Sequence, residues 1–327
     1  MPSPQKILIT GGTGFVGTHA VTELVRAGWQ VRCLVRGSSN RARLPAEVEL
    51  FEGELTATET LRDSLIGCDA VMHIAGLIRA RSQPEYLQIN RDVTTVLVKA
   101  AKAVGVKRFL LCSSQAAGGP ELNGWPRRVD DPQQPITNYG VSKLAGEEVL
   151  RSNAGDMWWA IVRPPAVYGP HDRAFFTFVR WVNFGFKLRL GNGSMRFNII
   201  HVHDLAVAMR MAIEADLPSG QTFYATDGEE YTLFDMGDTV EKALGKKAIW
   251  IPIPLGVAPG IAIVIEFVAG LSGKIPLLSR QKILELSQTA WTCDGETFRS
   301  KVNFQPQYDL RSGMAQTINW YRERGWI

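Results

Sequence analysis

Short apolar segments alternate with longer amphipathic segments through the first half of the chain. Six segments rich in β-branched and other apolar residues predict strands at residues 6–10, 30–35, 48–51, 70–73, 108–112 and 158–163. Four segments between them carry apolar residues at helical spacing and predict helices at residues 15–27, 58–66, 84–104 and 138–152. Strands this apolar cannot leave one face in water, so they fit a parallel sheet covered by helices on both faces.

The β-α alternation predicts an α/β fold with a Rossmann-type, doubly wound parallel sheet. After Pro164 the alternation breaks up, glycine and proline become frequent, and the remaining helical patterns are shorter. This change predicts a smaller, mostly C-terminal lobe laid over the strand ends. Ligands of such sheets bind beyond the carboxyl ends of the strands, so we expect a small-molecule substrate between the two parts.

Composition narrows the class of protein without naming a partner. The 327 residues are 45% hydrophobic and 21% charged, which allows a sizeable core and excludes a disordered chain. Lysine and arginine number 36 against 32 acidic residues, and this net charge of +4 gives no reason to expect nucleic acid as a partner. The cysteines lie far apart and no export signal opens the sequence, so we expect reduced thiols and a cytoplasmic location.

A glycine-rich turn follows the first predicted strand directly. Residues 10–17 read Thr-Gly-Gly-Thr-Gly-Phe-Val-Gly, and a predicted helix begins within them. Because glycines lack a Cβ atom, such a turn lets the amides of the helix N-terminus approach a pyrophosphate. A tight turn can be purely structural, but the strand before it and the helix after it are the context that a dinucleotide site requires. The residues assigned to cofactor binding are Gly11, Thr13, Gly14, Phe15, Val16 and Gly17.

The residue after the second predicted strand bears on the choice of dinucleotide. A carboxylate there would bond the adenosine ribose 2′-hydroxyl, whereas this chain has Arg36. A guanidinium group suits a 2′-phosphate. The sequence therefore favours NADP as the cofactor, with NAD as the alternative if Arg36 is only a solvated loop charge.

The glycine turn gives the two predicted parts their roles. We expect residues 1–165 and 197–225 to form a dinucleotide-binding domain. We expect residues 166–196 and 226–327 to form the substrate-binding lobe.

A tyrosine and a lysine share one face of the fourth predicted helix. Tyr139 and Lys143 lie four residues apart. A tyrosine with an ordinary pKa of about 10 exchanges protons poorly at neutral pH, and a nearby ammonium group lowers that pKa by stabilising the phenolate. The pair can therefore act as an acid and base catalyst. The same spacing occurs on ordinary helices, so the assignment depends on the surrounding motifs.

Six motifs in order along the chain carry a wider resemblance. They are the glycine turn, Gly53-Glu54-Leu55, His73-Ile74-Ala75-Gly76, Cys112-Ser113-Ser114, the Tyr139 segment and Arg163-Pro164-Pro165-Ala166-Val167-Tyr168-Gly169-Pro170. With these motifs the chain resembles the extended short-chain dehydrogenase/reductases of the NAD-dependent epimerase/dehydratase family. The resemblance spans nearly the whole chain and implies an NAD(P)-dependent oxidoreductase.

The resemblance also implies roles for individual residues. Tyr139 would transfer the proton, Lys143 would also bind the nicotinamide ribose, and Ser114 would hydrogen-bond the substrate oxygen. Ser113 competes with Ser114, but Ser114 keeps the family spacing to Gly119. The residues that would line the adenine pocket, the cofactor cleft and the nicotinamide are, in that order, Leu55, Ala75 and Pro164.

Two departures separate the chain from the nucleotide-sugar epimerases and dehydratases it resembles. Those enzymes usually have asparagine where this chain has Ala166. Their Arg-Asp-Phe motif aligns so that Phe197 replaces the arginine, and Arg196 lies one place early. Residues 174–186 are rich in aromatic side chains, most of them assigned to the core, and the lobe resembles the 3β-hydroxysteroid dehydrogenase and dihydroflavonol reductase branches. We therefore expect an apolar substrate.

Three functions remain open on the sequence. The first is an oxidoreductase that moves hydride between NADP and a secondary alcohol or ketone, with Tyr139 as the acid or base. The second is a nucleotide-sugar epimerase or dehydratase, which returns the hydride to the same substrate. The third is a non-catalytic NADP-binding scaffold or regulator, which the presence of both Tyr139 and Lys143 disfavours.

Three neighbouring residues invite a metal site. His201, His203 and Asp204 lie close together, but no further ligand cluster is evident, so we predict no metal. We expect Asp204 to cap a helix that begins at Leu205. We expect His73 to be packed within its strand.

A 17-residue apolar stretch, 255–271, carries Glu266 as its only charge. It is short for a spanning helix and is interrupted by proline and glycine. The basic residues between positions 245 and 282 are Lys246, Lys247, Lys274, Arg280 and Lys282. One interpretation is a helix packed over the substrate lobe or against another subunit, as in a homodimer. The other is peripheral contact of this stretch with an anionic membrane.

Overall fold

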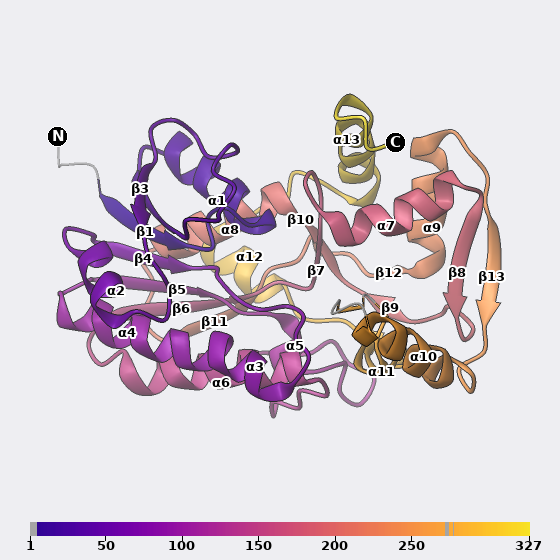
Figure 1. Ribbon diagram of the computed structural model, residues 1–327, viewed down its shortest axis with the longest axis horizontal. Helices are drawn as coiled ribbons and strands as arrows, with labels where there is room; N and C mark the ends of the chain where they lie inside the picture. The colour runs from indigo at the N-terminus through magenta and orange to yellow at the C-terminus, as the bar shows by residue number, and fades with distance from the viewer. Residues whose placement is uncertain (1–4, 272–274, 277) are drawn as a thin grey trace.

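A seven-stranded parallel sheet forms the centre of the protein (Figure 1), whose computed structural model describes residues 5–271, 275, 276 and 278–327. In spatial order its strands are β11 (Gln221–Tyr224), β6 (Trp158–Arg163), β5 (Arg108–Cys112), β4 (Ala70–His73), β1 (Lys6–Thr10), β2 (Gln30–Val35) and β3 (Glu49–Glu52). The order runs outward from β1 to β3 on one side and from β4 to β6 on the other. This arrangement confirms the predicted Rossmann-type, doubly wound fold.

The predicted strands agree closely with the observed ones. Five of them have the predicted bounds, and β3 is displaced by one residue. The sequence analysis missed β11, which pairs with β6 from Gln221 to Tyr224. That strand is short and lies beyond the break in the β-α alternation, so periodicity gave no sign of it.

Helices cover both faces of the sheet (Figure 1). One face carries α1 (Phe15–Arg26), α8 (Val202–Glu214) and α12 (Glu296–Val302). The other face carries α2 (Thr58–Leu65), α4 (Val93–Ala103) and α6 (Asn138–Asn153). Strand β1 shows the consequence, because Ile7 and Ile9 belong to one core cluster, Leu8 belongs to the other, and all three are fully buried.

The helix predicted at 84–104 is in fact three segments. They are α3 (Gln83–Leu87), the π-helix η1 (Gln88–Asp92) and α4. Within η1 the buried Asn90 side chain bonds the backbone N of Leu77 at 2.7 Å and the hydroxyl of Ser142 in α6 at 2.8 Å. The prediction of one continuous helix was therefore wrong, because a buried asparagine exchanges regular helix for tertiary hydrogen bonds.

The remaining elements lie beyond the strand ends. Three small sheets are formed by β7 (Ala166–Tyr168) with β10 (Ile199–His201), by β9 (Arg196–Phe197) with β12 (Tyr231–Thr232) and β14 (Ala290–Trp291), and by β8 (Phe186–Leu190) with β13 (Ile249–Ile253). The helices are α5 (Gln115–Gly118), α7 (Arg173–Asn183), α9 (Leu233–Leu244), α10 (Ala258–Leu271), α11 (Arg280–Leu286) and α13 (Leu310–Glu323). A separate core cluster joins α7, α9 and α13.

Two observations bear on the expected environment of the protein. All four cysteines are free and buried. Among the described helices, none combines the length and the apolar character that a membrane span requires.

Candidate active site

The glycine turn joins β1 to α1 and leaves the start of α1 open. Gly11 has a φ of +76°, and a Cβ atom there would lie 2.6 Å from the backbone N of Ala75. A Cβ atom on Gly17 would collide with the carbonyl oxygen of Gly11. The N-cap residue is Gly14, which offers no side-chain cap, so the first amides of α1 can bind an anion. The turn therefore fits the pyrophosphate of a dinucleotide.

Two arginines lie in the loop after β2. Arg36 is exposed, and its backbone N bonds the hydroxyl of Ser39 at 3.1 Å. Arg41 donates to the Glu52 carboxylate at 2.5 Å and to the carbonyl oxygen of Arg36 at 3.4 Å. The sequence analysis singled out Arg36 alone, although the second arginine of the same loop was a signal for a shared basic site.

Three consecutive residues at the end of β5 pair with three successive turns of α6. The carbonyl oxygen of Cys112 accepts a hydrogen bond from the Nζ of Lys143 at 2.7 Å. The hydroxyl of Ser113 donates to the Glu147 carboxylate at 2.5 Å, and the hydroxyl of Ser114 pairs with that of Tyr139. Residues four apart lie on one helix face, so a single strand end fixes all three side chains. The structure thus brings together the predicted Ser114, Tyr139 and Lys143.

The two adjacent serines have different partners. Ser113 is buried and donates to Glu147 inside the protein. Ser114 is partly exposed, lies beside Tyr139, and accepts a hydrogen bond from the backbone N of Ala116 at 3.2 Å as the N-cap of α5. Only Ser114 therefore offers a hydroxyl next to the tyrosine.

The protonation of Tyr139 differs from the expectation. Burial raises the pKa of Tyr139 well above its usual value, although the hydrogen bond with Ser114 works in the opposite direction. Burial also lowers the pKa of Lys143, whose Nζ points to the Cys112 carbonyl oxygen. The predicted lowering of the tyrosine pKa by Lys143 was therefore wrong for this arrangement. Tyr139 therefore keeps its proton at neutral pH.

A buried ion pair anchors α6 one turn beyond Lys143. Arg163, at the end of β6, bonds Glu147 through two nitrogen atoms at 2.8 and 2.6 Å, and both side chains are fully buried. Burial alone would raise the pKa of Glu147, but the hydrogen bonds from Arg163 hold it below its usual value. The sequence analysis missed this pair. The position of Glu147, one turn beyond Lys143 on the same helix face, was the available signal.

The carboxyl ends of β1, β4 and β6 meet around this network. Ala75 donates its backbone N to the carbonyl oxygen of Thr10 at 3.0 Å, and a Cβ atom on Gly76 would lie 3.6 Å from the Nζ of Lys143. Pro164 accepts the backbone N of Gln115 at 2.8 Å. The glycine turn and Lys143 therefore border the same loop after β4. Leu55 lies farther along, partly buried against the core.

The histidine residues have structural partners. His73 is buried and bonds the hydroxyls of Thr10 at 2.6 Å and Thr94 at 3.1 Å, as expected of a packed strand residue. The neighbouring Asp204 does not cap α8. Its carboxylate instead accepts hydrogen bonds from the backbone N–H groups of Gln307 and Tyr308, both at 2.9 Å. The expectation of a cap was wrong, since α8 begins earlier, after His201.

Four histidines form a cluster where α1 meets the start of α8. His19 lies 4.7 Å from His203 and 5.7 Å from His171, and His201 lies 5.0 Å from His203, measured between ring centroids. Within the described part of the chain, no group of three or more His, Cys, Asp or Glu residues is arranged to hold a metal ion. The histidine rings pack against each other and against Tyr308, whose ring is tilted relative to that of His201 with 4.2 Å between the ring centroids.

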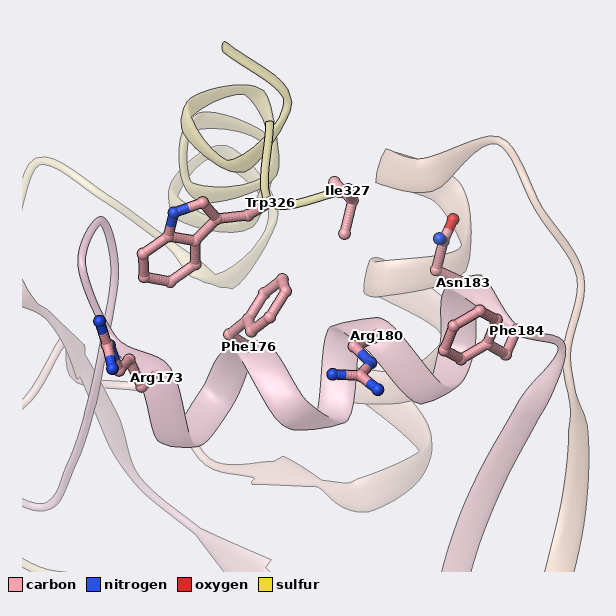
Figure 2. A pocket seen from close by; sticks show the side chains of 7 residues that line it. All are labelled: Arg173, Phe176, Arg180, Asn183, Phe184, Trp326 and Ile327. Carbon is pink, nitrogen blue, oxygen red and sulfur yellow. The ribbon is translucent and has the colours of Figure 1, made fainter. Parts of the chain in front are cut away.

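A cavity of about 550 Å³ lies away from Tyr139, on the outer face of α7. Figure 2 shows its lining, which is Arg173, Phe176, Arg180, Asn183, Phe184, Trp326 and Ile327. Phe176 packs against Tyr321 and Trp326 at 5.1 and 5.0 Å between ring centroids. This aromatic residue of the 174–186 segment therefore belongs to the contact with the C-terminus.

The family assignment follows from comparison with known proteins. The NAD dependent epimerase/dehydratase family matches residues 7–225, from β1 to just beyond β11. The chain belongs to this family. The match confirms the resemblance seen in the sequence, and makes the protein an NAD(P)-dependent oxidoreductase of the epimerase/dehydratase family.

Relatives of this family include both reductases and epimerases. The ceramide reductase of Caulobacter vibrioides is 30% identical over 325 residues, which cover 98% of this chain and 96% of that protein. The UDP-glucose 4-epimerase of Vibrio cholerae is 28% identical over 327 residues, which cover 96% and 94%. The crystal structure of gox2253 has a TM-score of 0.81 and 26% identity, and covers 98% of this chain and 99% of that chain.

Proposed function

We propose that the protein is an NADP-dependent reductase that converts a ketone of an apolar, lipid-like substrate to a secondary alcohol, or the reverse. The observation that carries the proposal is the placement of the Tyr139 hydroxyl beside the Ser114 hydroxyl at the end of β5, with Lys143 one turn farther along α6. A bound NADPH would supply the hydride. The protein's part is to hold the carbonyl oxygen between Ser114 and Tyr139 and to give it a proton.

The supporting residues keep this geometry in place. In the proposal, Lys143 bonds the nicotinamide ribose while its ammonium stays anchored on the Cys112 carbonyl. Ala75 and Pro164 line the cofactor cleft, and Leu55 lines the adenine pocket.

The preference for NADP rests on the loop after β2. Arg36 is exposed there and Arg41 lies against its carbonyl oxygen, so positive charge gathers where an adenosine 2′-phosphate would sit. Glu52 neutralises part of that charge through Arg41. Arg36 is therefore the main phosphate ligand in this proposal.

Two observations favour an apolar ketone over a sugar nucleotide as the substrate. Arg196 is bonded to Glu121 at 2.8 Å and to Glu230 at 2.6 Å, so its guanidinium is already neutralised. Ala166 replaces the asparagine of the epimerases and offers no polar group. Among the relatives, the ceramide reductase is named for a lipid substrate, and the UDP-glucose 4-epimerase represents the alternative.

We also propose a separate role for each of two parts of the chain, and a location for the protein. Residues 1–165 and 197–225 would bind the dinucleotide, and the seven-stranded sheet supports this because all its strands lie within them. Residues 166–196 and 226–327 would bind the substrate. We propose a cytoplasmic enzyme that touches the membrane peripherally through 255–271, with a homodimer as the competing use of that stretch.

One assay separates the three functions. The full-length protein is incubated with NADPH and a 3-keto lipid in detergent and, in parallel, with NAD or NADP and UDP-glucose. Oxidation of the nicotinamide is followed by absorbance, and UDP-sugars are resolved by chromatography. We expect net oxidation of NADPH with the keto lipid, and none with the Tyr139→Phe variant.

The other outcomes each overturn the proposal. Interconversion of UDP-sugars without net change in the nicotinamide would make the protein an epimerase. Tight binding of NADPH with no turnover of either substrate class would make it a scaffold. Equal rates for the wild type and Tyr139→Phe would remove the tyrosine from its assigned role.

A further inference from the structure

Helix α10 buries its small residues and exposes its large ones. Of its 14 residues, only Ala258 and Ala262 are buried. Val264 is 62% exposed, Phe267 67% and Leu271 76%. A helix that packed on a water-soluble core would turn these large side chains inward. The outer face of α10 is therefore built to lie against something apolar.

The apolar surface continues beyond α10. Among the described residues, nineteen large hydrophobic side chains are exposed, and eleven of them lie between positions 249 and 275. Ile249 and Ile251 of the neighbouring β13 are 66% and 38% exposed. The end of β13 packs on α10 through Ile253, so the two elements form one surface, defined here as the α10 face. Figure 1 shows both at the same end of the molecule.

Basic side chains outnumber acidic ones around the α10 face. Glu266 is the only acidic residue from position 246 to position 282, and the Arg280 guanidinium bonds it at 2.8 Å. Lys247, just before β13, has a side chain that is 95% exposed and lies 3.6 Å from the Glu241 carboxylate. Lys282 in α11 is 44% exposed and bonds the Glu285 carboxylate at 2.6 Å. Lys274 lies outside the described residues. The basic residues of the rim therefore outnumber its acidic residues, and Glu241, Glu266 and Glu285 are each paired with one of these cations.

We propose that the α10 face docks on an anionic lipid bilayer. Large apolar side chains would enter the interface between headgroups and acyl chains, while Lys246, Lys247 and Lys282 would meet lipid phosphates. A second copy of the chain fits less well, because a two-fold dimer would place this basic rim against itself. The helix is too short to span the bilayer, so the contact is peripheral.

The docked surface would lie next to the catalytic residues. Helix α11 packs on α10 through Ile283 and reaches α6, where the Gln281 side chain accepts the backbone N of Asn138 at 2.8 Å. Asn138 directly precedes Tyr139. A bilayer at the α10 face would thus present an apolar substrate close to the site entrance. This link rests on the proposed function, whereas the docking itself does not.

Vesicle sedimentation tests the docking without any assay of turnover. The full-length protein is mixed at low salt with vesicles of phosphatidylcholine alone or of phosphatidylcholine with phosphatidylglycerol. The variants are Val264→Glu within the face, Lys247→Glu on its rim, and Ile66→Glu as a matched control, since Ile66 is 58% exposed after α2. NADPH binding, measured by fluorescence, confirms that each variant is folded.

We expect the wild type and Ile66→Glu to sediment with the anionic vesicles. Val264→Glu should lower the partition coefficient at least about tenfold, and Lys247→Glu should lower it about fivefold. Wild-type protein that stays in the supernatant overturns the proposal, as does equal binding by Val264→Glu. Equal binding to both vesicle types removes the electrostatic part. A dimer in sedimentation velocity that Val264→Glu dissociates, without vesicle binding, assigns the face to a second copy instead.

Discussion

The surroundings of Tyr139 and the α10 face use side chains in opposite ways. Around Tyr139, buried charged groups have partners, as in the contacts of Lys143 with Cys112 and of Glu147 with Arg163. On the α10 face, large apolar groups are exposed, and small ones such as Ala262 are buried. Gln281 and Asn138 join the two regions through one hydrogen bond of 2.8 Å.

The difference shows what each region has to do. Buried, fully paired polar groups fix the positions of reacting atoms, and their cost is offset only when every member has its partner. Exposed apolar groups stabilise nothing in the isolated chain, and they gain free energy only when another apolar phase removes them from water. Substitutions in the first region should therefore act on folding and turnover, and those in the second on association.

The largest expected effect comes from removing one member of the buried ion pair. Glu147→Ala leaves the fully buried Arg163 without its carboxylate and Ser113 without its acceptor. We expect the free energy of unfolding to fall by about 3–5 kcal/mol. Chemical denaturation measures it, with Glu148→Ala as the control, because Glu148 is the exposed neighbour on the same helix. Similar losses for both variants would contradict a special role for the pair.

The next effect concerns chemistry alone. Tyr139→Phe removes the hydroxyl beside Ser114 while keeping the ring, so we expect kcat to fall at least about a hundredfold with NADPH affinity nearly unchanged. Because burial raises the pKa of Tyr139, wild-type kcat for ketone reduction should stay flat through neutral and mildly alkaline pH. A loss of wild-type activity near neutral pH that parallels deprotonation of a single group would argue against a protonated Tyr139.

The sequence predicted the residues of the candidate active site better than the buried polar contacts that support them. The strand bounds and the positions of Ser114, Tyr139 and Lys143 followed from local patterns, because parallel strand ends must meet at one edge. Asn90, Arg163 and Asp204 did not, since each acts through a partner distant in sequence, such as Ser142, Glu147 or the backbone of Gln307. Periodicity reports which face is apolar, but not which buried polar groups will find each other.

The histidine cluster makes stability depend on pH. Burial lowers the pKa of His201 to about 3, that of His19 to about 4 and that of His171 to about 4, with further lowering by neighbouring positive groups. The unfolded chain, with histidine pKa values of about 6.5, binds more protons between these limits, so stability falls as pH drops below about 6.5.

From the fully buried His201 alone, we expect the free energy of unfolding to fall by about 2 kcal/mol between about pH 7 and about pH 5. Denaturant melts at both pH values measure this loss. The double variant His19→Gln, His203→Gln should show a shallower dependence of stability on pH. The dependence that remains comes from His201 and from His73, because burial lowers the pKa of His73 to about 3. Equal stability at both pH values would rule out neutral burial of these rings.

A smaller effect is expected at the cofactor loop. Arg36→Ala should weaken NADPH about tenfold and NADH hardly at all, because only NADPH carries the phosphate that a guanidinium can bind. Arg41→Ala should have a weaker effect, since Glu52 already holds that side chain at 2.5 Å. Titration of both nucleotides by fluorescence provides the internal control. Equal losses for NADPH and NADH would leave Arg36 as a loop charge and return the preference to NAD.

The smallest expected effect on stability is at Val264, on the outer face of α10. Val264→Glu replaces an apolar helix residue with a charge, a change that is severe in a packed core, yet this side chain is 62% exposed. We expect the free energy of unfolding to change by no more than about 0.5 kcal/mol in the absence of lipid. Ala262→Glu on the buried face of the same helix should lower it clearly, because α10 packs on its neighbours through that position. If Val264→Glu were as destabilising as Ala262→Glu, the outer face of α10 would already be packed within the chain, and no surface would remain there for a bilayer to cover.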